Sequence, residues 1–184
     1  MKHRIIFLAL IFGAVFFAIP VLADDECPAW KDQTFRKLHS AETFNLCESF
    51  PSQPMLIVNT ASHCGFTPQF SALEAVHQRF RNEGFTVVGF ASDDFRQAAE
   101  NEEIAAEICY KNFGVTFTMA APISVKGENA SPLFQQLAAK TQAPDWNFNK
   151  YLVSADGERV EYFSSGELPN SPEMIEKISA LLVR

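Results

Sequence analysis

One segment, residues 55–70, constrains the fold more than any other, because an apolar run leads directly to a cysteine and then to a helix start. Met55–Val58 is apolar throughout, which is typical of a buried strand. After a short turn of small and polar residues comes Cys64. Thr67 and Pro68 then predict a helix with Thr67 at its N-cap and Pro68 at its first position. The sequence therefore places Cys64 between a strand and a helix N-terminus.

A sulfur at that place is suited to redox chemistry. The free N–H groups and the dipole of a helix N-terminus favour the thiolate of Cys64 over the thiol. The alternative is a buried cysteine that only fills space in the core. Position alone favours the functional interpretation but does not decide it.

The first residues have the composition of a secretion signal. Basic residues at positions 2–4 precede the apolar run Ile5–Ile19, and a small-residue cleavage pattern ends at Ala23. The run is shorter than the roughly 20 residues of a membrane span, although an uncleaved anchor is the alternative. We expect a signal peptide at residues 1–23. The exported protein would then be one domain, residues 24–184, located in the periplasm or, alternatively, secreted.

The chain is acidic, with a formal net charge of −7. Cleavage of the leader would remove basic residues and make the surface more acidic still. Such a surface repels the phosphates of nucleic acids and of anionic lipids. We therefore expect neither a nucleic acid nor a stable membrane partner.

Four cysteines follow the leader: Cys27, Cys47, Cys64 and Cys109. An exported chain meets an oxidising compartment, where disulfides persist. Four cysteines allow three pairings, and we rank a structural Cys27–Cys47 disulfide first. This pair flanks a short region with two expected hairpin strands, Thr34–Leu38 and Thr43–Cys47. The alternative is that one of the two cysteines belongs to the redox centre.

The rest of the chain alternates strands and helices. A helix over residues 68–82 and a strand at Phe85–Phe90 complete a parallel βαβ unit with Met55–Val58. The expected elements that follow are a helix from Asn101 through Cys109, strand residues at Thr116–Phe117 and Pro122–Val125, a helix over residues 132–139, a hairpin of Trp146–Val153 and Arg159–Phe163, and a last helix from Pro172. With the N-terminal β-hairpin, this pattern predicts a thioredoxin-like α/β fold, a central mixed sheet flanked by helices.

Two motifs resemble those of the glutathione peroxidase family. Asn59–Thr67 closely matches the family's active-site signature, and Trp146–Lys150 matches a second block at the right distance. Glu102–Ile104 and Gly114–Phe117 are similar to the segment between them, so the resemblance spans about residues 32–183. It implies a thioredoxin-like fold and a thiol-dependent peroxidase that acts in the oxidative stress response.

The family's active site contains a cysteine or selenocysteine, a glutamine, a tryptophan and an asparagine, which implies roles here for Cys64, Trp146 and Asn147. The indole N–H and the amide donate hydrogen bonds suited to a thiolate or a peroxide oxygen. At the glutamine position the chain departs from the family and has Asp94. A carboxylate disfavours a nearby thiolate, so Asp94 accepts the thiol proton, is itself protonated, or turns away. Gln97 is our second candidate for the missing amide.

Cys109 lies where two-cysteine members of the family keep their resolving cysteine. The resemblance implies that Cys64 reduces hydrogen peroxide or an organic or lipid hydroperoxide and becomes a sulfenic acid, with which Cys109 condenses. A thioredoxin-like dithiol or glutathione would then reduce the disulfide. An inert, buried Cys109 is the alternative. Apart from the thiol co-substrate, we expect no cofactor and no metal.

Three other functions are open at this point. A thiol–disulfide oxidoreductase normally has a Cys-x-x-Cys motif, but Thr67 stands at the second cysteine position. A metal-binding thioredoxin-fold protein that uses Cys64 and His63 needs a second soft ligand, and the motif contains none. A degenerate peroxidase, weakened by Asp93 and Asp94, would serve mainly in sensing or binding.

Overall fold

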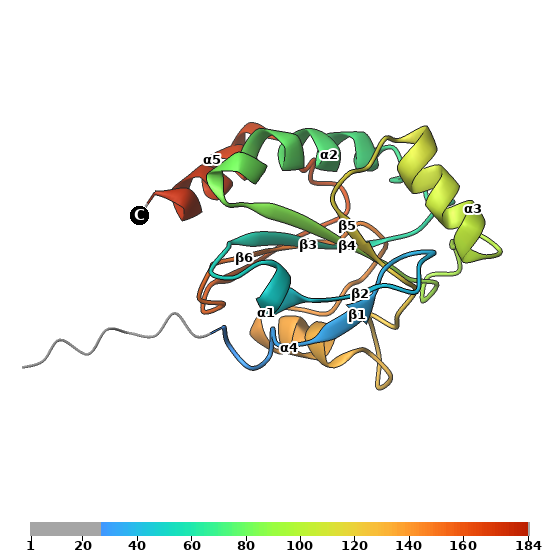
Figure 1. Ribbon diagram of the computed structural model, residues 1–184, viewed down its shortest axis with the longest axis horizontal. Helices are drawn as coiled ribbons and strands as arrows, with labels where there is room; N and C mark the ends of the chain where they lie inside the picture. The colour runs from blue at the N-terminus through green and yellow to red at the C-terminus, as the bar shows by residue number, and fades with distance from the viewer. Residues whose placement is uncertain (1–26, 184) are drawn as a thin grey trace, which may run out of the picture.

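The computed structural model describes residues 27–183, so the expected signal peptide at residues 1–23 lies outside the described residues. A five-stranded mixed sheet has helices on both faces and a separate two-stranded hairpin beside it (Figure 1). This architecture confirms the predicted thioredoxin-like α/β fold with an N-terminal β-hairpin. The strands are β1 (Thr34–Arg36), β2 (Thr43–Asn45), β3 (Met55–Thr60), β4 (Thr86–Ala91), β5 (Thr118–Ala120), β6 (Lys150–Val153) and β7 (Val160–Phe163).

The helices start where the sequence supplies caps. They are α1 (Leu46–Ser49), α2 (Gln69–Phe80) with its 3₁₀ extension η1 (Arg81–Glu83), α3 (Glu102–Ala106), the π-helical turn η2 (Glu107–Asn112), α4 (Pro132–Lys140) and α5 (Pro172–Leu182). Ser131 and Ser171 cap α4 and α5 through their side chains, each directly before a proline at the first helical position. Among the described residues, no helix is both long and hydrophobic enough to cross a membrane.

The sheet has the order β5-β4-β3-β6-β7, with β3 at its centre. Strand β3 is parallel to β4 and antiparallel to β6, and β6 pairs antiparallel with β7. All of β3 is buried because both faces of the sheet are covered. Its side chains alternate between two hydrophobic cores, with Leu56 and Val58 in one and Met55 and Ile57 in the other.

The two cores divide the helices between the faces of the sheet (Figure 1). Helices α2 and α5 pack on the first face, and both Cys64 and Cys109 belong to that core. The N-terminal hairpin, α1 and α4 cover the second face. Thus the two free cysteines lie on the same side of the sheet.

At four places the observed secondary structure differs from the predicted one by a few residues. The strand expected at Thr116–Phe117 and Pro122–Val125 is instead β5, which lies between these two segments. Cys47 lies in helix α1 rather than at the end of a strand, because the side chain of Asn45 caps a helical turn there. The run from Trp146 forms a strand only from Lys150, and a turn carries the residues before it. Helix α2 begins at Gln69, one residue later than expected.

Cys27 and Cys47 form a disulfide with 5.7 Å between their Cα atoms. The segment after Cys27 contacts the end of α4, where Lys140 Nζ lies 5.6 Å from the centre of the Trp30 ring. It also contacts the β6–β7 turn, where Lys31 Nζ donates to the carbonyl oxygen of Ala155 (3.0 Å). Pro28 packs against Gly157 in the same turn. The disulfide thus attaches this N-terminal segment to α1 on the second face of the sheet.

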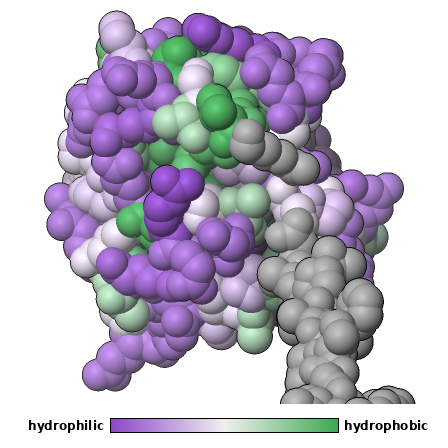
Figure 2. All heavy atoms as spheres, turned by 90° about the vertical axis from the view of Figure 1, so that its left-hand side faces the viewer, coloured by the Kyte–Doolittle hydropathy of each residue, from purple (hydrophilic) through white to green (hydrophobic). Residues whose placement is uncertain are grey.

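The far end of the sheet has a small surface hollow. Leu152, Val160 and Leu181 line it, between the β6–β7 hairpin and the C-terminal part of α5. Figure 2 views this end of the molecule and shows an apolar area surrounded by hydrophilic side chains. In the strand register, this end pairs with the start of β3, whereas Cys64 follows the end of β3. The hollow is therefore remote from the cysteine loop.

Candidate active site

The loop between β3 and α2 holds Cys64 through short-range hydrogen bonds. The backbone N–H of Cys64 donates to Thr67 Oγ1 (3.0 Å), and this hydroxyl donates to the carbonyl oxygen of Ala61 (3.1 Å). Thr67 therefore closes the loop around the cysteine. The prediction that Thr67 is the N-cap of α2 was wrong, because Pro68 occupies that position. The N–H of Phe66 donates to Cys64 Sγ (3.4 Å). A backbone N–H directed at this sulfur supports negative charge on it.

The second motif forms a turn that is tied to β3. Asn59 Nδ2 donates to the carbonyl oxygen of Trp146 (2.9 Å). Asn149 Oδ1 accepts from the backbone N–H groups of Asp145 and Trp146, both at 2.9 Å. The indole of Trp146 is 41% exposed and its ring packs on that of Phe95, with 5.4 Å between centroids. The strand before Cys64 therefore anchors the turn that carries Trp146.

Gln97 connects the cysteine loop with this turn. Its carbonyl oxygen accepts from the N–H of His63 (2.9 Å), the residue before Cys64. Its side-chain Oε1 accepts from Asn147 Nδ2 (3.0 Å). The structure thus brings Gln97 and Asn147 into direct contact beside the cysteine loop.

One polar atom of the Asn147 side chain is left unpaired. Its side chain is fully buried, and among the described residues its Oδ1 has no hydrogen-bond partner. If the side-chain amides of both Asn147 and Gln97 are rotated by 180°, Gln97 donates to Asn147 and the bond between them is preserved. An N–H of Asn147 is then the unpaired group instead of its oxygen. A buried unpaired polar atom is costly, so this side chain retains hydrogen-bonding capacity beside the cysteine loop.

Asp94 is placed differently from what the motif predicts. Its carboxylate accepts hydrogen bonds from the backbone N–H groups of Val125 (2.6 Å) and Lys126 (3.1 Å) and from the Ser124 hydroxyl (3.1 Å). These bonds hold the carboxylate against residues 124–126, the last of our three expected alternatives. Gln97, and not Asp94, is therefore the side chain that contacts Asn147.

Cys109 lies in the π-helical turn η2 and is 1% exposed. Burial, together with the nearby charge of Glu74, raises the pKa of its thiol to about 12. Cys64 and Cys109 are both free cysteines in the same core. At neutral pH Cys109 is therefore a protonated thiol, protected within its helix.

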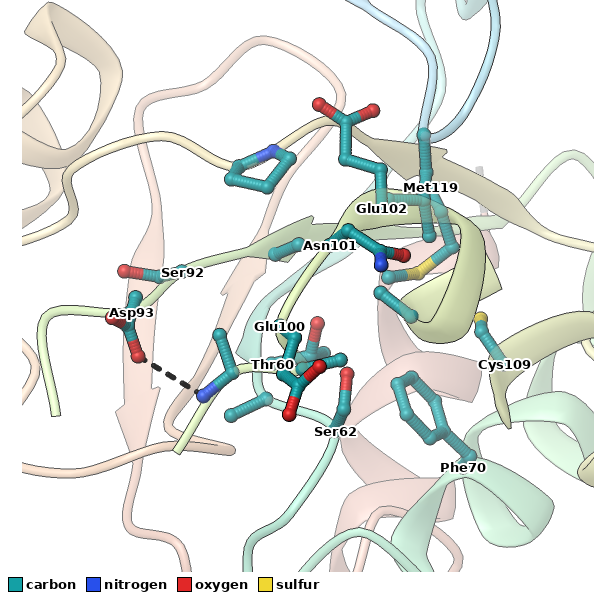
Figure 3. A pocket seen from close by; sticks show the side chains of 17 residues that line it. Thr60, Ser62, Phe70, Ser92, Asp93, Glu100, Asn101, Glu102, Cys109 and Met119 are labelled. Atoms are coloured by element: carbon teal, nitrogen blue, oxygen red, sulfur yellow. Dashed lines mark hydrogen bonds between the residues drawn. The ribbon is translucent and has the colours of Figure 1, made fainter. Parts of the chain in front are cut away.

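A pocket of about 200 Å³ lies between the loop before Cys64 and the helix with Cys109 (Figure 3). Thr60 and Ser62 line it from the end of β3, and Cys109 lines it from η2. In the view of Figure 3, Phe70 lies between Ser62 and Cys109. The pocket thus provides free space directly beside the Cys109 side chain.

The sequence motifs did not reveal several side chains that build the site. Asn59, Gln69, Asn149, Lys150 and Ser165 are buried and hydrogen-bonded around the turn. Three of them lie inside the two matched motifs. The motif sequences do not distinguish residues that support the site from residues that take part in a reaction. Among residues 27–183, no cluster of three or more His, Cys, Asp or Glu side chains is arranged to hold a metal ion.

A mixed sheet with a cysteine in the loop after its central strand is typical of thioredoxin-fold redox proteins. The family model for glutathione peroxidase matches residues 33–138, more than half of the 184 residues of the chain. The chain therefore belongs to the glutathione peroxidase family, and it is a glutathione peroxidase-like peroxidase.

The names of similar proteins are consistent with membership of this family. A glutathione peroxidase-like peroxiredoxin of Schizosaccharomyces pombe is 41% identical over 125 residues, covering 65% of this chain and 79% of that protein. A glutathione peroxidase of Lactococcus lactis is 39% identical over 150 residues, covering 78% of this chain and 93% of that protein. The crystal structure of T. cruzi GPX1 has a TM-score of 0.65 and 28% identity, covering 83% of this chain and 95% of that one.

Proposed function

We propose that Cys64 is the peroxidatic residue of this thiol peroxidase. Its thiolate attacks one oxygen of the peroxide, the S–O bond forms, the O–O bond breaks, and the departing oxygen takes a proton to leave as water or an alcohol. The observation that carries this proposal is the contact of Gln97 with both the Cys64 loop and Asn147. Donors fixed beside the breaking bond stabilise the charge that develops there.

Cys109 completes the proposed cycle as the resolving cysteine. Its sulfur attacks the sulfenic sulfur of Cys64, the S–S bond forms, and the hydroxyl leaves as water with the thiol proton. A disulfide needs Cα atoms within about 7 Å, so η2 must open for this step. Short π-helical turns are frequent at functional sites, and this one borders a pocket; both observations support such an opening.

A thioredoxin-like dithiol, or alternatively glutathione, then reduces the Cys64–Cys109 disulfide. The substrates are hydrogen peroxide and organic or lipid hydroperoxides, and the setting is an exported, periplasmic protein in the oxidative stress response. The names of the S. pombe and L. lactis relatives support a thiol-dependent peroxidase. The residues 1–23 and the Cys27–Cys47 disulfide support export. Recovery of the chain in the cytoplasmic fraction of its cells would contradict that setting.

Stopped-flow oxidation by hydrogen peroxide tests the first step. We expect Cys64 to react at least about 100-fold faster than free cysteine, and Cys64→Ser to abolish the reaction. A rate near that of free cysteine would contradict the proposal and favour a degenerate peroxidase.

Mass spectrometry after one equivalent of peroxide tests the second step. The wild type should lose the mass of two hydrogens as its disulfide forms, whereas Cys109→Ser should gain one oxygen at Cys64. A wild-type protein that keeps the added oxygen, with Cys109 still reduced, would exclude the resolving role while leaving the peroxidatic role intact.

A further inference from the structure

The turn that carries Trp146 and Asn147 has an unfavourable backbone conformation. Phe148 has a φ of 64°, in the left-handed region that a bulky side chain rarely adopts. Its buried ring packs edge-on against Phe70, with 5.3 Å between centroids. Such a conformation persists only where the surrounding contacts impose it. Contacts from outside the turn therefore decide where Asn147 lies.

Ser165, on the loop after β7, supplies such contacts. Its hydroxyl donates to the carbonyl oxygen of Asn147 (2.7 Å) and accepts from Asn149 Nδ2 (3.2 Å). Its own carbonyl oxygen accepts from Gln69 Nε2 (2.7 Å), in the first residue of α2. Ser165 is 6% exposed, so water has little access to replace these bonds. Ser165 thus links the helix that follows Cys64 with the turn that carries Asn147.

Lys150 in turn holds the loop of Ser165. Its side chain is fully buried. Nζ donates to the carbonyl oxygens of Ser164 (3.2 Å), Ser165 (3.4 Å) and Glu167 (2.6 Å). An ammonium group has three N–H donors, and all three acceptors belong to this loop. Among the described residues, no carboxylate forms an ion pair with Lys150.

We propose that Ser165 and Lys150 are positioning residues for the peroxidase reaction, which hold Asn147 against Gln97, and that loss of the Lys150 proton weakens this hold. The inference rests on the proposed function of Cys64 and adds an upper pH limit to it. Neither residue is placed to touch the reacting atoms: Ser165 acts through the backbone of the turn, and Lys150 acts through the loop of Ser165.

The charge on Lys150 is sensitive to pH in an accessible range. Burial lowers the pKa of Lys150 to about 8, although the negative charge of Glu167 acts in the opposite direction and raises it. The neighbouring strands place the apolar Val58 and Phe163 opposite it, and α2 contributes the neutral Gln69. A neutral amine has only two N–H groups for three carbonyl oxygens. One acceptor of the loop therefore loses its donor above about pH 8.

The variant Ser165→Ala tests the first half of the proposal. The rate of Cys64 oxidation by hydrogen peroxide should fall about tenfold, because both hydrogen bonds of the Ser165 hydroxyl to the turn are lost. The matched control is Ser154→Ala, which removes an equally buried hydroxyl that bonds Asp156 in the β6–β7 turn. The rate in this control should equal that of the wild type.

The pH profile tests the second half. Thiol oxidation normally accelerates with pH as the thiolate forms, whereas we expect the wild-type rate to fall above about pH 8, roughly tenfold by about pH 10. Lys150→Met should be slow throughout and lack this decline. The control Lys31→Met removes another fully buried lysine, which bonds Ala155 instead, and should keep the decline.

Folding stability separates positioning from a merely structural effect. Because the pKa of Lys150 is lowered from 10.5 to about 8, the unfolded chain binds its proton more readily between these values. Its contribution to stability therefore rises with pH in the same window in which we expect the rate to fall. The side-chain amide NMR signal of Asn147 should shift with a midpoint of about pH 8 in the wild type and remain constant in Lys150→Met.

The outcomes distinguish this inference from the function on which it rests. A wild-type rate near that of free cysteine overturns both. A fast wild type whose rate is matched by Ser165→Ala, or whose rate shows no alkaline decline, overturns the positioning role alone. Should Lys150→Met fail to fold, Ser165→Ala and the wild-type profile still decide.

Discussion

At the scale of single residues, we expect the reactivity of Cys64 to depend on Gln97, whose side-chain amide contacts Asn147. Gln97→Ala keeps the backbone contact with His63 but removes the side-chain bond to Asn147. We expect the rate of Cys64 oxidation to fall at least about tenfold, because an oriented donor is lost at the breaking O–O bond. Stopped-flow measurement with hydrogen peroxide checks this, with thermal unfolding as the control for stability. An unchanged rate would remove Gln97 from the site.

Asp94 should behave in the opposite way. Asp94→Asn weakens the bonds to residues 124–126, so we expect a loss of about 1 kcal/mol in unfolding free energy and a rate within twofold of the wild type. Denaturant unfolding and the same stopped-flow assay measure the two quantities. A large fall in rate at unchanged stability would return Asp94 to the reaction.

Asp94 and Gln97 also show which part of the site the sequence does not reveal. Cys64 and Asn147 stand in motifs with a defined spacing, so the motifs alone select them. The choice between Asp94 and Gln97 depends on the path of the loop, and Arg96 has a φ of 56°. Arginine has no preference for this left-handed conformation, so no residue type signals the turn that brings Gln97 to Asn147.

At the scale of elements, the helix with Cys109 was predictable at its start and not in its interior. Asn101 caps α3 by accepting from the N–H of Ile104 (3.0 Å), and acidic residues fill its first turn. The π-helical turn η2 carries no sequence period of its own, since it depends on packing around one extra residue. The sequence therefore placed Cys109 on a helix but not in its least regular part.

The start of this helix is held by the N-terminal hairpin. The Arg36 guanidinium pairs with both carboxylate oxygens of Glu102. The side chain of Arg36 is 44% exposed, so solvent screens the pair and its contribution to stability is small. Arg36→Gln should speed hydrogen exchange of the amides in α3 and η2 about threefold. The matched control is Lys37→Gln, which breaks a pair within the hairpin and should leave this exchange unchanged, whereas equal effects of the two variants would contradict the specific link.

Cys109 gives the helix a pH dependence of known sign. The pKa of its thiol is raised from 9.0 to about 12, so between these values the unfolded chain has lost the proton that the folded chain keeps. Stability from this group is therefore full below pH 9 and falls above it, by at most about 1.4 kcal/mol for each pH unit. Denaturant unfolding from about pH 8 to pH 10 should show this loss relative to Cys109→Ser. Parallel curves would place the thiol in contact with water.

At the scale of the whole molecule, the predictable part is the part built from local patterns. The βαβ unit and the β6–β7 hairpin follow from strand periodicity and turn residues, and together they define most of the sheet. The placement of the N-terminal segment does not follow, because Lys31 contacts Ala155 across more than a hundred residues of chain. Such a contact leaves no mark in local composition.

The Cys27–Cys47 disulfide is expected to contribute to stability without affecting the reaction. It closes a loop with a sequence separation of 20, which stabilises the fold by about 3 kcal/mol in the chain-entropy model. For a chain of this length that corresponds to a Tm roughly 6–12 °C higher. The disulfide ends in α1, whose Leu46 packs on the second face, whereas Cys64 lies on the first face. The double variant Cys27→Ala/Cys47→Ala should thus show the lower Tm by calorimetry and an unchanged rate of Cys64 oxidation. A slowed reaction at temperatures well below the Tm would mean that the N-terminal segment also supports the site.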